Sequence, residues 1–192
     1  MNMDSEKYRK ELKQKLIESA AKVVYTYTAH WKMVDHFESW NWKIKIGQIV
    51  FTGIASCGLL SLLFSNYPYF PIVCSAFAFM SLCLNLYSLH SNLPNQIKQH
   101  IDAANELWLI RESYMTLITD FDVLTTEKIR AQRDYLTAQV HHVNKTYPGT
   151  SPKSYSEAQI ALKQKEEQTF NAGEAEKILN LDTNSRPNKK ND

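Results

Sequence analysis

Residues 46–89, IGQIVFTGIASCGLLSLLFSNYPYFPIVCSAFAFMSLCLNLYSL, decide the fold of this chain. They lie in a segment between Lys45 and Lys98 that contains no Asp, Glu, Lys or Arg. A bilayer core about 30 Å thick needs about 20 apolar residues of helix. Two such helices and the short break SNYPYFP at 65–71 account for nearly the whole stretch. We predict a transmembrane helical hairpin with spans 46–64 and 72–89; the alternative is a buried hairpin in a soluble helical bundle.

The basic residues that flank this stretch predict its orientation. Lys43 and Lys45 precede the first span, Lys98 follows the second, and the connecting loop carries no charge. Because Lys and Arg accumulate on the cytoplasmic side, we expect a multi-pass protein of the inner (cell) membrane with both termini in the cytoplasm. The polar start of the chain lacks the apolar core of a signal peptide, so the first span would act as an uncleaved anchor. Four aromatic residues suit the two membrane interfaces: Trp40, Trp42, Tyr67 and Tyr69.

The regions before and after the hairpin are also predicted to be helical, so the predicted fold class is an all-α membrane protein. We divide the chain into a cytosolic amphipathic helix (1–45), the transmembrane hairpin (46–90), a cytosolic helical region (91–181) and a disordered tail (182–192). The tail is assigned from its Asn, Lys, Asp, Ser and Pro content.

Each cytosolic arm carries an apolar stripe at alternating three- and four-residue spacings, which is typical of amphipathic or coiled-coil helices. The N-terminal stripe comprises Leu16, Ala20, Val23, Tyr27, His30, Val34 and Phe37. The stripe after the hairpin comprises Leu107, Ile110, Tyr114, Leu117 and Phe121, and a third helix, to about residue 144, carries Ile129, Leu136, Val140 and Val143. We expect the first two stripes to join copies of the chain into a homo-oligomer.

Polar and turn-forming residues predict where the helices after the hairpin begin and end. Leu93-Pro94 marks a break or a first helical turn, residues 120–122 a bend, and Thr125 or Thr126 a helix cap. After the loop at 147–152, Ser154 and Glu157 match a capping box for a helix to about residue 170.

Composition and motifs argue against an enzyme and against nucleic-acid binding. The chain has 22 Lys and Arg against 20 Asp and Glu, so it lacks the excess of basic residues that is typical of nucleic-acid-binding proteins. It lacks a phosphate-binding glycine loop, a nucleophile elbow and a Cys-x-x-Cys motif, and we predict no cofactor. The three cysteines, Cys57, Cys74 and Cys83, fall in the spans, where packing is the simpler interpretation.

Three groups of polar residues each allow a functional and a plainer interpretation. His141-His142 suggests a metal, but adjacent residues on a helix point in different directions, and a solvated pair is simpler. Asp120 and Asp122 form either an acid–base pair or a helix-ending bend. His30 is either a pH sensor or a packed core histidine.

The spans contain the candidate functional residues, which are small or polar. In the second span Cys74, Ala78, Ser81, Asn85 and Ser88 are spaced four, three, four and three residues apart. In the first span Gly53, Cys57 and Ser61 form a small-xxx-small series. We assign the remaining surface of the second span to lipid: Phe77, Phe79, Leu82, Leu84, Leu86 and Leu89. Small and polar residues either pack helices closely in lipid or line a pore once several hairpins assemble, and both interpretations remain open.

The arrangement resembles the SLATT family, two-transmembrane effector proteins encoded beside bacterial nucleotide-signalling and nucleotide-sensing genes. The local matches are YPGTSPKSYSEA at 147–158, similar to the family's proline-threonine turn and tyrosine-containing helix start, and WNWK at 40–43 before a glycine-containing span. The resemblance implies no catalytic residues. It implies an effector of antiphage defence that forms pores when a nucleotide-producing or nucleotide-sensing partner activates it, causing abortive infection.

Two functions therefore compete. The first is a pore-forming membrane effector that contacts the lipid bilayer, other copies and such a partner. The second is a non-conducting, membrane-anchored helical scaffold that recruits a cytosolic partner.

Overall fold

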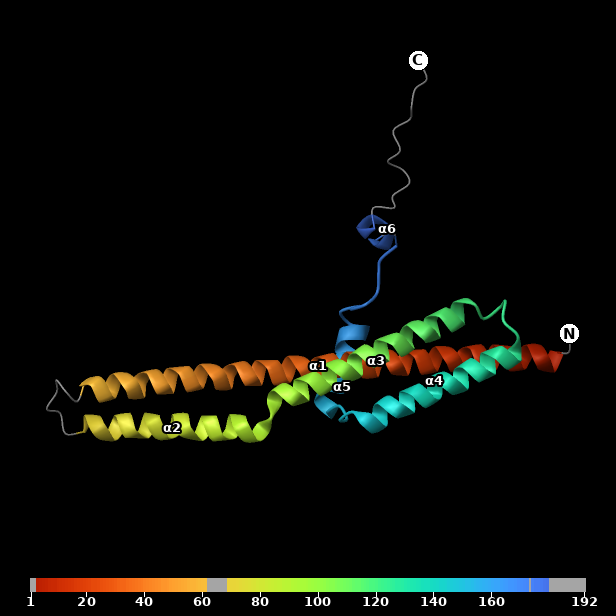
Figure 1. The fold of residues 1–192 in the computed structure, drawn as a ribbon. Coiled ribbons are helices and arrows are strands. Elements are labelled where there is room, and N and C mark those ends of the chain that lie inside the picture. Colours follow the sequence, from red (N-terminus) through yellow and green to blue (C-terminus); the bar gives the residue numbers. More distant parts are fainter. Residues whose placement is uncertain (1–2, 62–68, 173, 180–192) are drawn as a thin grey trace, which may run out of the picture. The chain divides into compact units, whose positions relative to one another are not determined.

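The computed structural model describes residues 3–61, 69–172 and 174–179, and over these residues the chain is all-helical (Figure 1). The helices are α1 (Met3–Ser61), α2 (Phe70–Ser91), α3 (Leu93–Thr119), α4 (Thr126–Thr146), α5 (Pro152–Lys163) and α6 (Glu174–Ile178). This confirms the predicted all-α class. Most of the break at 65–71, the end of the first span at 62–64 and the tail at 182–192 lie outside the described residues.

Helix α1 is continuous over 59 residues and passes through the boundary expected at residue 45 without interruption. Its N-terminal half packs against α3 and, to a lesser extent, α4, and its C-terminal part packs against α2 (Figure 1). One helix therefore belongs to both the charged bundle and the uncharged hairpin.

A single residue separates α2 from α3. Asn92 has φ 46° and ψ 38°, the left-handed conformation that asparagine tolerates better than most residues. Its carbonyl accepts hydrogen bonds from the backbone N–H groups of Asn95 and Gln96, at 3.1 and 3.2 Å, at the start of α3. Pro94 lies in the first turn of α3, where its missing N–H costs no helical hydrogen bond. The break expected at 93–94 is confirmed as this elbow.

The apolar stripes form the core of the bundle, but they do so within one chain. Leu16, Ala20 and Val23 of α1 are buried against residues of α3 and α4. The buried partners are Ala103, Leu107, Ile110, Tyr114, Leu117, Phe121, Ile129, Leu136 and Val143. The stripes are thus confirmed as the core of one chain. Their expected role in joining copies stays a prediction.

The turn between α3 and α4 is held by α1. Thr125 caps α4 by accepting a 3.4 Å hydrogen bond from the Lys128 N–H, as expected. Arg9 donates to the carbonyl oxygens of Phe121 (2.9 Å) and Leu124 (3.2 Å) and to Thr126 Oγ1 (3.0 Å). Asp122 pairs with Lys13 at 3.2 Å, which supports the bend over the acid–base interpretation.

Helix α5 begins earlier than the capping box predicted. Ser151 is the cap: its Oγ accepts a 3.1 Å hydrogen bond from the Ser154 N–H, with Pro152 at the first helical position. Ser154 is instead fully buried, and Glu157 contacts His36 rather than a capping serine. The helix also ends at Lys163 rather than near residue 170, so both bounds of this element were wrong.

A second unit begins at residue 159, and its described part contains the last turn of α5 and the short α6. Glu174 Oε2 accepts a 2.8 Å hydrogen bond from the Asn171 N–H ahead of α6. The site and the inferences below lie entirely in the first unit.

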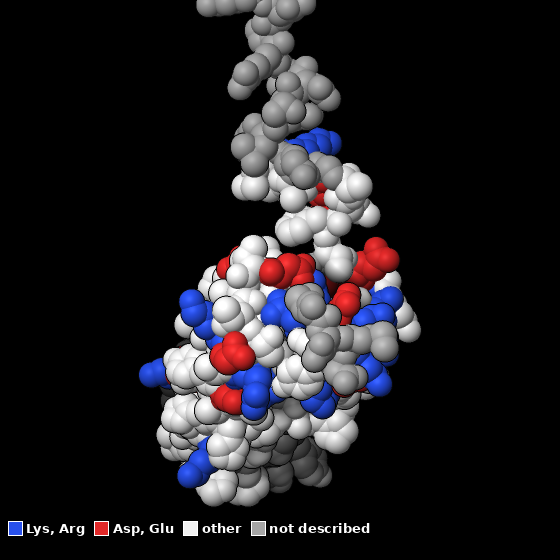
Figure 2. Space-filling model, turned by 90° about the vertical axis from the view of Figure 1, so that its right-hand side faces the viewer, with Lys and Arg blue, Asp and Glu red and all other residues white. Residues whose placement is uncertain are grey.

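Charges are mixed on the end of the molecule shown in Figure 2. Lys and Arg side chains are interspersed there with Asp and Glu. That face therefore has no extended patch of side chains with the same charge.

Candidate functional site

The antiparallel hairpin of α1 and α2 contains the candidate functional residues. Three contacts set its register: Gln48 Nε2 donates to the Leu84 carbonyl at 3.1 Å, Thr52 Oγ1 lies 2.6 Å from Ser81 Oγ, and the rings of Phe51 and Phe77 lie 5.8 Å apart. Polar side chains therefore form hydrogen bonds between the helices in a segment that carries no formal charge. In lipid such bonds are worth about 0.6–2 kcal/mol each.

The helices approach most closely at Gly58 of α1. A Cβ at this position would overlap Cys74 Sγ and lie 2.9 Å from Cys74 Cβ. The line of contact between α1 and α2 is here called the seam. At its other end, a Cβ on Gly47 would lie 3.1 Å from Leu84 Cδ1. Glycine at 58 therefore permits a contact that no other residue allows without displacing α2.

The structure divides the candidate residues of the second span into two groups. Cys74 and Ser81 are buried against α1, and Ser88 is half-buried. Ala78 and Asn85 are exposed on the outer surface of α2. Buried and exposed members cannot all form one inter-helix seam within a single chain.

The candidates of the first span lie mostly outside the seam. Gly53 and Cys57 are exposed, and a Cβ on Gly53 would meet nothing within 4 Å. The Ser61 side chain lies outside the described residues. Whether the exposed candidates line a pore or pack against other copies stays a prediction.

Sequence reasoning missed part of the seam. On α2 it follows Cys74, Phe77, Ser81, Leu84 and Ser88, so the assignment of Phe77 and Leu84 to lipid was wrong. On α1 it follows Gln48, Phe51, Ala55 and Gly58. Both observed sets repeat at alternating three and four residues, but so does the predicted set that includes Ala78 and Asn85. Spacing alone therefore could not choose between the two faces.

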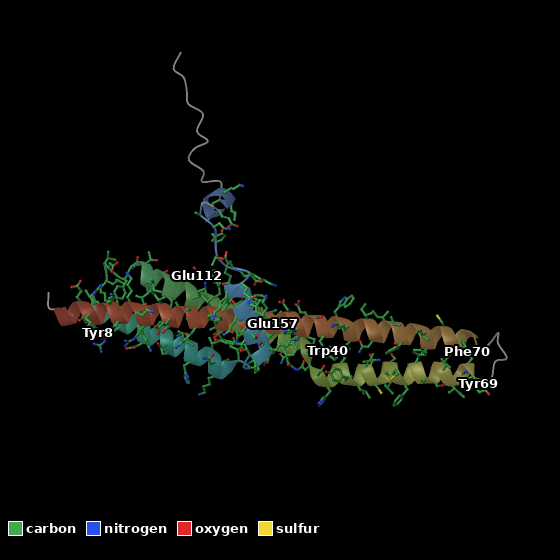
Figure 3. All side chains as sticks on the ribbon, turned by 180° about the vertical axis from the view of Figure 1, so that it is seen from behind. Tyr8, Trp40, Tyr69, Phe70, Glu112 and Glu157 are labelled. Atoms are coloured by element: carbon green, nitrogen blue, oxygen red, sulfur yellow. The ribbon has the colours of Figure 1, made fainter. Side chains whose placement is uncertain are left out.

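The remaining surface of α2 is apolar and open. Within the described residues, one segment, Phe70–Thr119 (α2 and α3), includes an 18-residue window that is long and apolar enough to cross a membrane, and only 11% of that window is buried. Phe79, Leu82, Leu86 and Leu89 are between 53% and 80% exposed. Figure 3 shows Trp40 beside the C-terminal end of α2 and Tyr69 and Phe70 at its opposite end.

A buried histidine pair lies between α1 and α3, close to the hairpin. His30 and His100 are 4% and 2% exposed, and their Nδ1 atoms lie 2.8 Å apart. Burial, and then the neighbouring His100, lowers the pKa of His30 to about 4; burial also lowers the pKa of His100. The Phe37 ring packs 5.6 Å from the His100 ring. The core interpretation of His30 holds, but the sequence did not indicate its partner.

Two further polar contacts tie the later helices to α1 and α3. His36 Nε2 lies 2.6 Å from Glu157 Oε2 of α5, and the Tyr147 hydroxyl donates to Glu106 Oε1 at 2.6 Å. This hydrogen bond to a carboxylate, with some burial, raises the pKa of Tyr147 to about 12. These contacts attach the loop at 147–152 to the bundle.

No group of three or more His, Cys, Asp or Glu side chains suited to a metal occurs among the described residues. His141 and His142 are both exposed on α4. The chemistry of the site is thus hydrogen bonding, close packing and apolar contact.

No curated protein and no solved structure matches the sequence. A family model described as "SMODS and SLOG-associating 2TM effector domain family 4" matches residues 12–174, which include the hairpin, the bundle and the loop before α5. Together with the open apolar surface of α2, this match indicates membrane association. The chain belongs to this family of effector domains.

Proposed function

We propose that this protein is a two-span membrane effector of antiphage defence that assembles into pores or disrupts the inner membrane. Family membership supports the effector role and its link to nucleotide signalling. In this proposal the α1–α2 hairpin spans the bilayer with both termini in the cytoplasm, and a nucleotide-producing or nucleotide-sensing partner activates it. Membrane breach then halts the infected cell.

The observation that carries the proposal is Asn85, an amide side chain exposed on the largely apolar outer surface of α2. It is exposed in the single chain, four residues from the buried Ser81 and between the exposed Leu82 and Leu89. An amide facing lipid lacks hydrogen-bond partners, which is costly in hydrocarbon. Contact with a second copy or with a water-filled path removes this cost, and both require assembly.

The dimensions of α2 fit a span. Its 22 residues rise about 33 Å at 1.5 Å per residue, which matches a hydrocarbon core of about 30 Å. The aromatic residues at its two ends suit the two interfaces of a bilayer.

The test is dye and ion leakage from liposomes that contain the purified full chain, with and without the protein encoded beside it. We expect leakage to rise when the partner and its nucleotide are present. Insertion without leakage under all conditions would contradict the pore and favour the scaffold that recruits a cytosolic partner.

A further inference from the structure

We propose that the chain binds one anionic phospholipid in a cleft beside the elbow between α2 and α3. The cleft, here called the elbow cleft, measures about 620 Å³, within the usual range for a small-molecule site. It is lined by residues of four helices, including Phe37, Trp40, Tyr87, His90, Gln96 and Lys153.

The position of the elbow cleft matches the headgroup layer of a bilayer. Trp40 lies three residues before Lys43, the first basic residue flanking the hairpin, so about 4.5 Å of helix separates the two. The headgroup layer on each side of a membrane is about 5–8 Å thick. This placement rests on the membrane insertion in the proposed function.

One wall of the cleft is aromatic and continues into the apolar surface of the hairpin. Trp40 Nε1 donates to the Tyr87 hydroxyl at 3.2 Å, which joins α1 to α2 at this level. Both rings are close to half exposed, and Leu86 and Leu89 beside them are 58% and 80% exposed. Tryptophan and tyrosine favour this depth, where an acyl chain meets its headgroup.

The other wall is polar, and Lys153 is its one lining residue with a permanent charge. Lys153 and His36 line it, and none of the lining residues is acidic. Glu157 Oε2 lies 2.6 Å from His36 Nε2, and Glu157 Oε1 lies 4.0 Å from Lys153 Nζ, at the outer limit of an ion pair. The Lys153 side chain is 73% exposed and able to reach a phosphate. An aromatic wall together with a lysine fits an anionic lipid better than a soluble anion.

Such a lipid would contact α1, the elbow and the start of α5 at once. Bound lipid would therefore add a link between the hairpin and the bundle to those already made by continuous helix α1 and by the elbow at Asn92. This gives the protein a means of responding to membrane composition.

Native mass spectrometry of the detergent-solubilised full chain, titrated with phosphatidylglycerol or phosphatidylcholine, tests the inference. We expect one phosphatidylglycerol retained in preference to phosphatidylcholine, and a loss of affinity of about fivefold in Lys153→Gln, the effect of one lysine near an anionic surface. Lys128→Gln removes the same charge from α4, away from the cleft, and should leave retention unchanged. Circular dichroism checks that both variants fold.

Equal retention of the two lipids, or equal affinity in the parent and Lys153→Gln, would overturn the site. Binding of glycerol phosphate as tight as that of the lipid would also overturn it, because the aromatic wall would then contribute nothing. These outcomes are separate from the leakage assay: a chain that permeabilises liposomes but retains no lipid refutes the cleft and leaves the proposed function standing.

Discussion

His30 of α1 and His100 of α3 share one hydrogen bond, with their Nδ1 atoms 2.8 Å apart and both rings buried. In a neutral pair, one Nδ1 carries the proton and the other accepts it. Protonating the acceptor would place a second proton between the two nitrogens and a charge in the α1–α3 interface. The hydrogen bond between the two rings therefore requires one of the Nδ1 atoms to be unprotonated.

Acidification should destabilise the bundle through this pair. A histidine with a lowered pKa binds its proton more weakly when folded, so stability is unaffected well above pH 6.5 and falls as pH drops toward 4. The full contribution of His30 is about 3 kcal/mol. Thermal unfolding between pH 7.5 and 4 measures it, and the double variant His30→Leu, His100→Leu is the comparison. Identical pH dependence in the parent and the double variant would assign the effect to other groups.

Replacing Gly58 should separate the helices of the hairpin. Gly58→Ala places a Cβ on Cys74, and overpacking of this kind costs about 1–3 kcal/mol. Gly53→Ala is the matched control, because nothing lies within 4 Å of its Cβ. Spin-label distances between α1 and α2 in detergent should lengthen for Gly58→Ala alone. Equal distances in the two variants would show that the approach of α1 to α2 is looser than described.

Replacing Arg9 should loosen the α3–α4 turn. Arg9→Gln removes the guanidinium fork that satisfies three acceptors, for a cost of about 2 kcal/mol. Arg9→Lys should recover only part of this, since an ammonium lacks the fork. Hydrogen exchange at the Val123 and Leu124 amides reports the change, with the neighbouring Lys10→Gln as control. Unchanged protection in Arg9→Gln would mean that the turn is held by its own backbone bonds.

Replacing Asn85 should separate the pore and packing interpretations. If Asn85 lines a conducting path, Asn85→Leu should insert normally but leak less, because apolar constrictions dewet, and Asn85→Asp should favour cations. If it packs between copies, Asn85→Leu should weaken assembly by about 1 kcal/mol per contact. Ser81→Ala, in the buried seam, should alter hairpin stability without altering selectivity. Unaltered selectivity in an assembled Asn85→Asp protein would exclude Asn85 from the path.

The sequence predicted the helices and the bundle core well because both depend on local patterns. Leu16, Leu107 and Ile129 each belong to an apolar stripe that repeats at helical spacing along its own helix, so the buried face of each helix could be predicted directly. The capping error at Ser154 has a simple cause: Ser151 and Ser154 both precede plausible helix starts, and Pro152 at the first position decided between them.

The candidate site was predicted less well because polarity no longer marks the buried face in an uncharged helix. Asn85 and Ser81 are both polar residues in the same uncharged helix, yet Asn85 is exposed and Ser81 is buried. The His30–His100 pair shows a second limit, since 70 residues separate two side chains that only tertiary packing brings together.

The continuity of α1 also fixes the order in which the chain acquires its contacts during synthesis. All the helices that pack on α1 follow it in the sequence, and α2 precedes α3. The ribosome therefore releases the partner of the C-terminal part of α1 first, while the stripe of its N-terminal half still lacks a partner. The hairpin can close before the bundle forms, and α3 then meets a helix already held in place at one end.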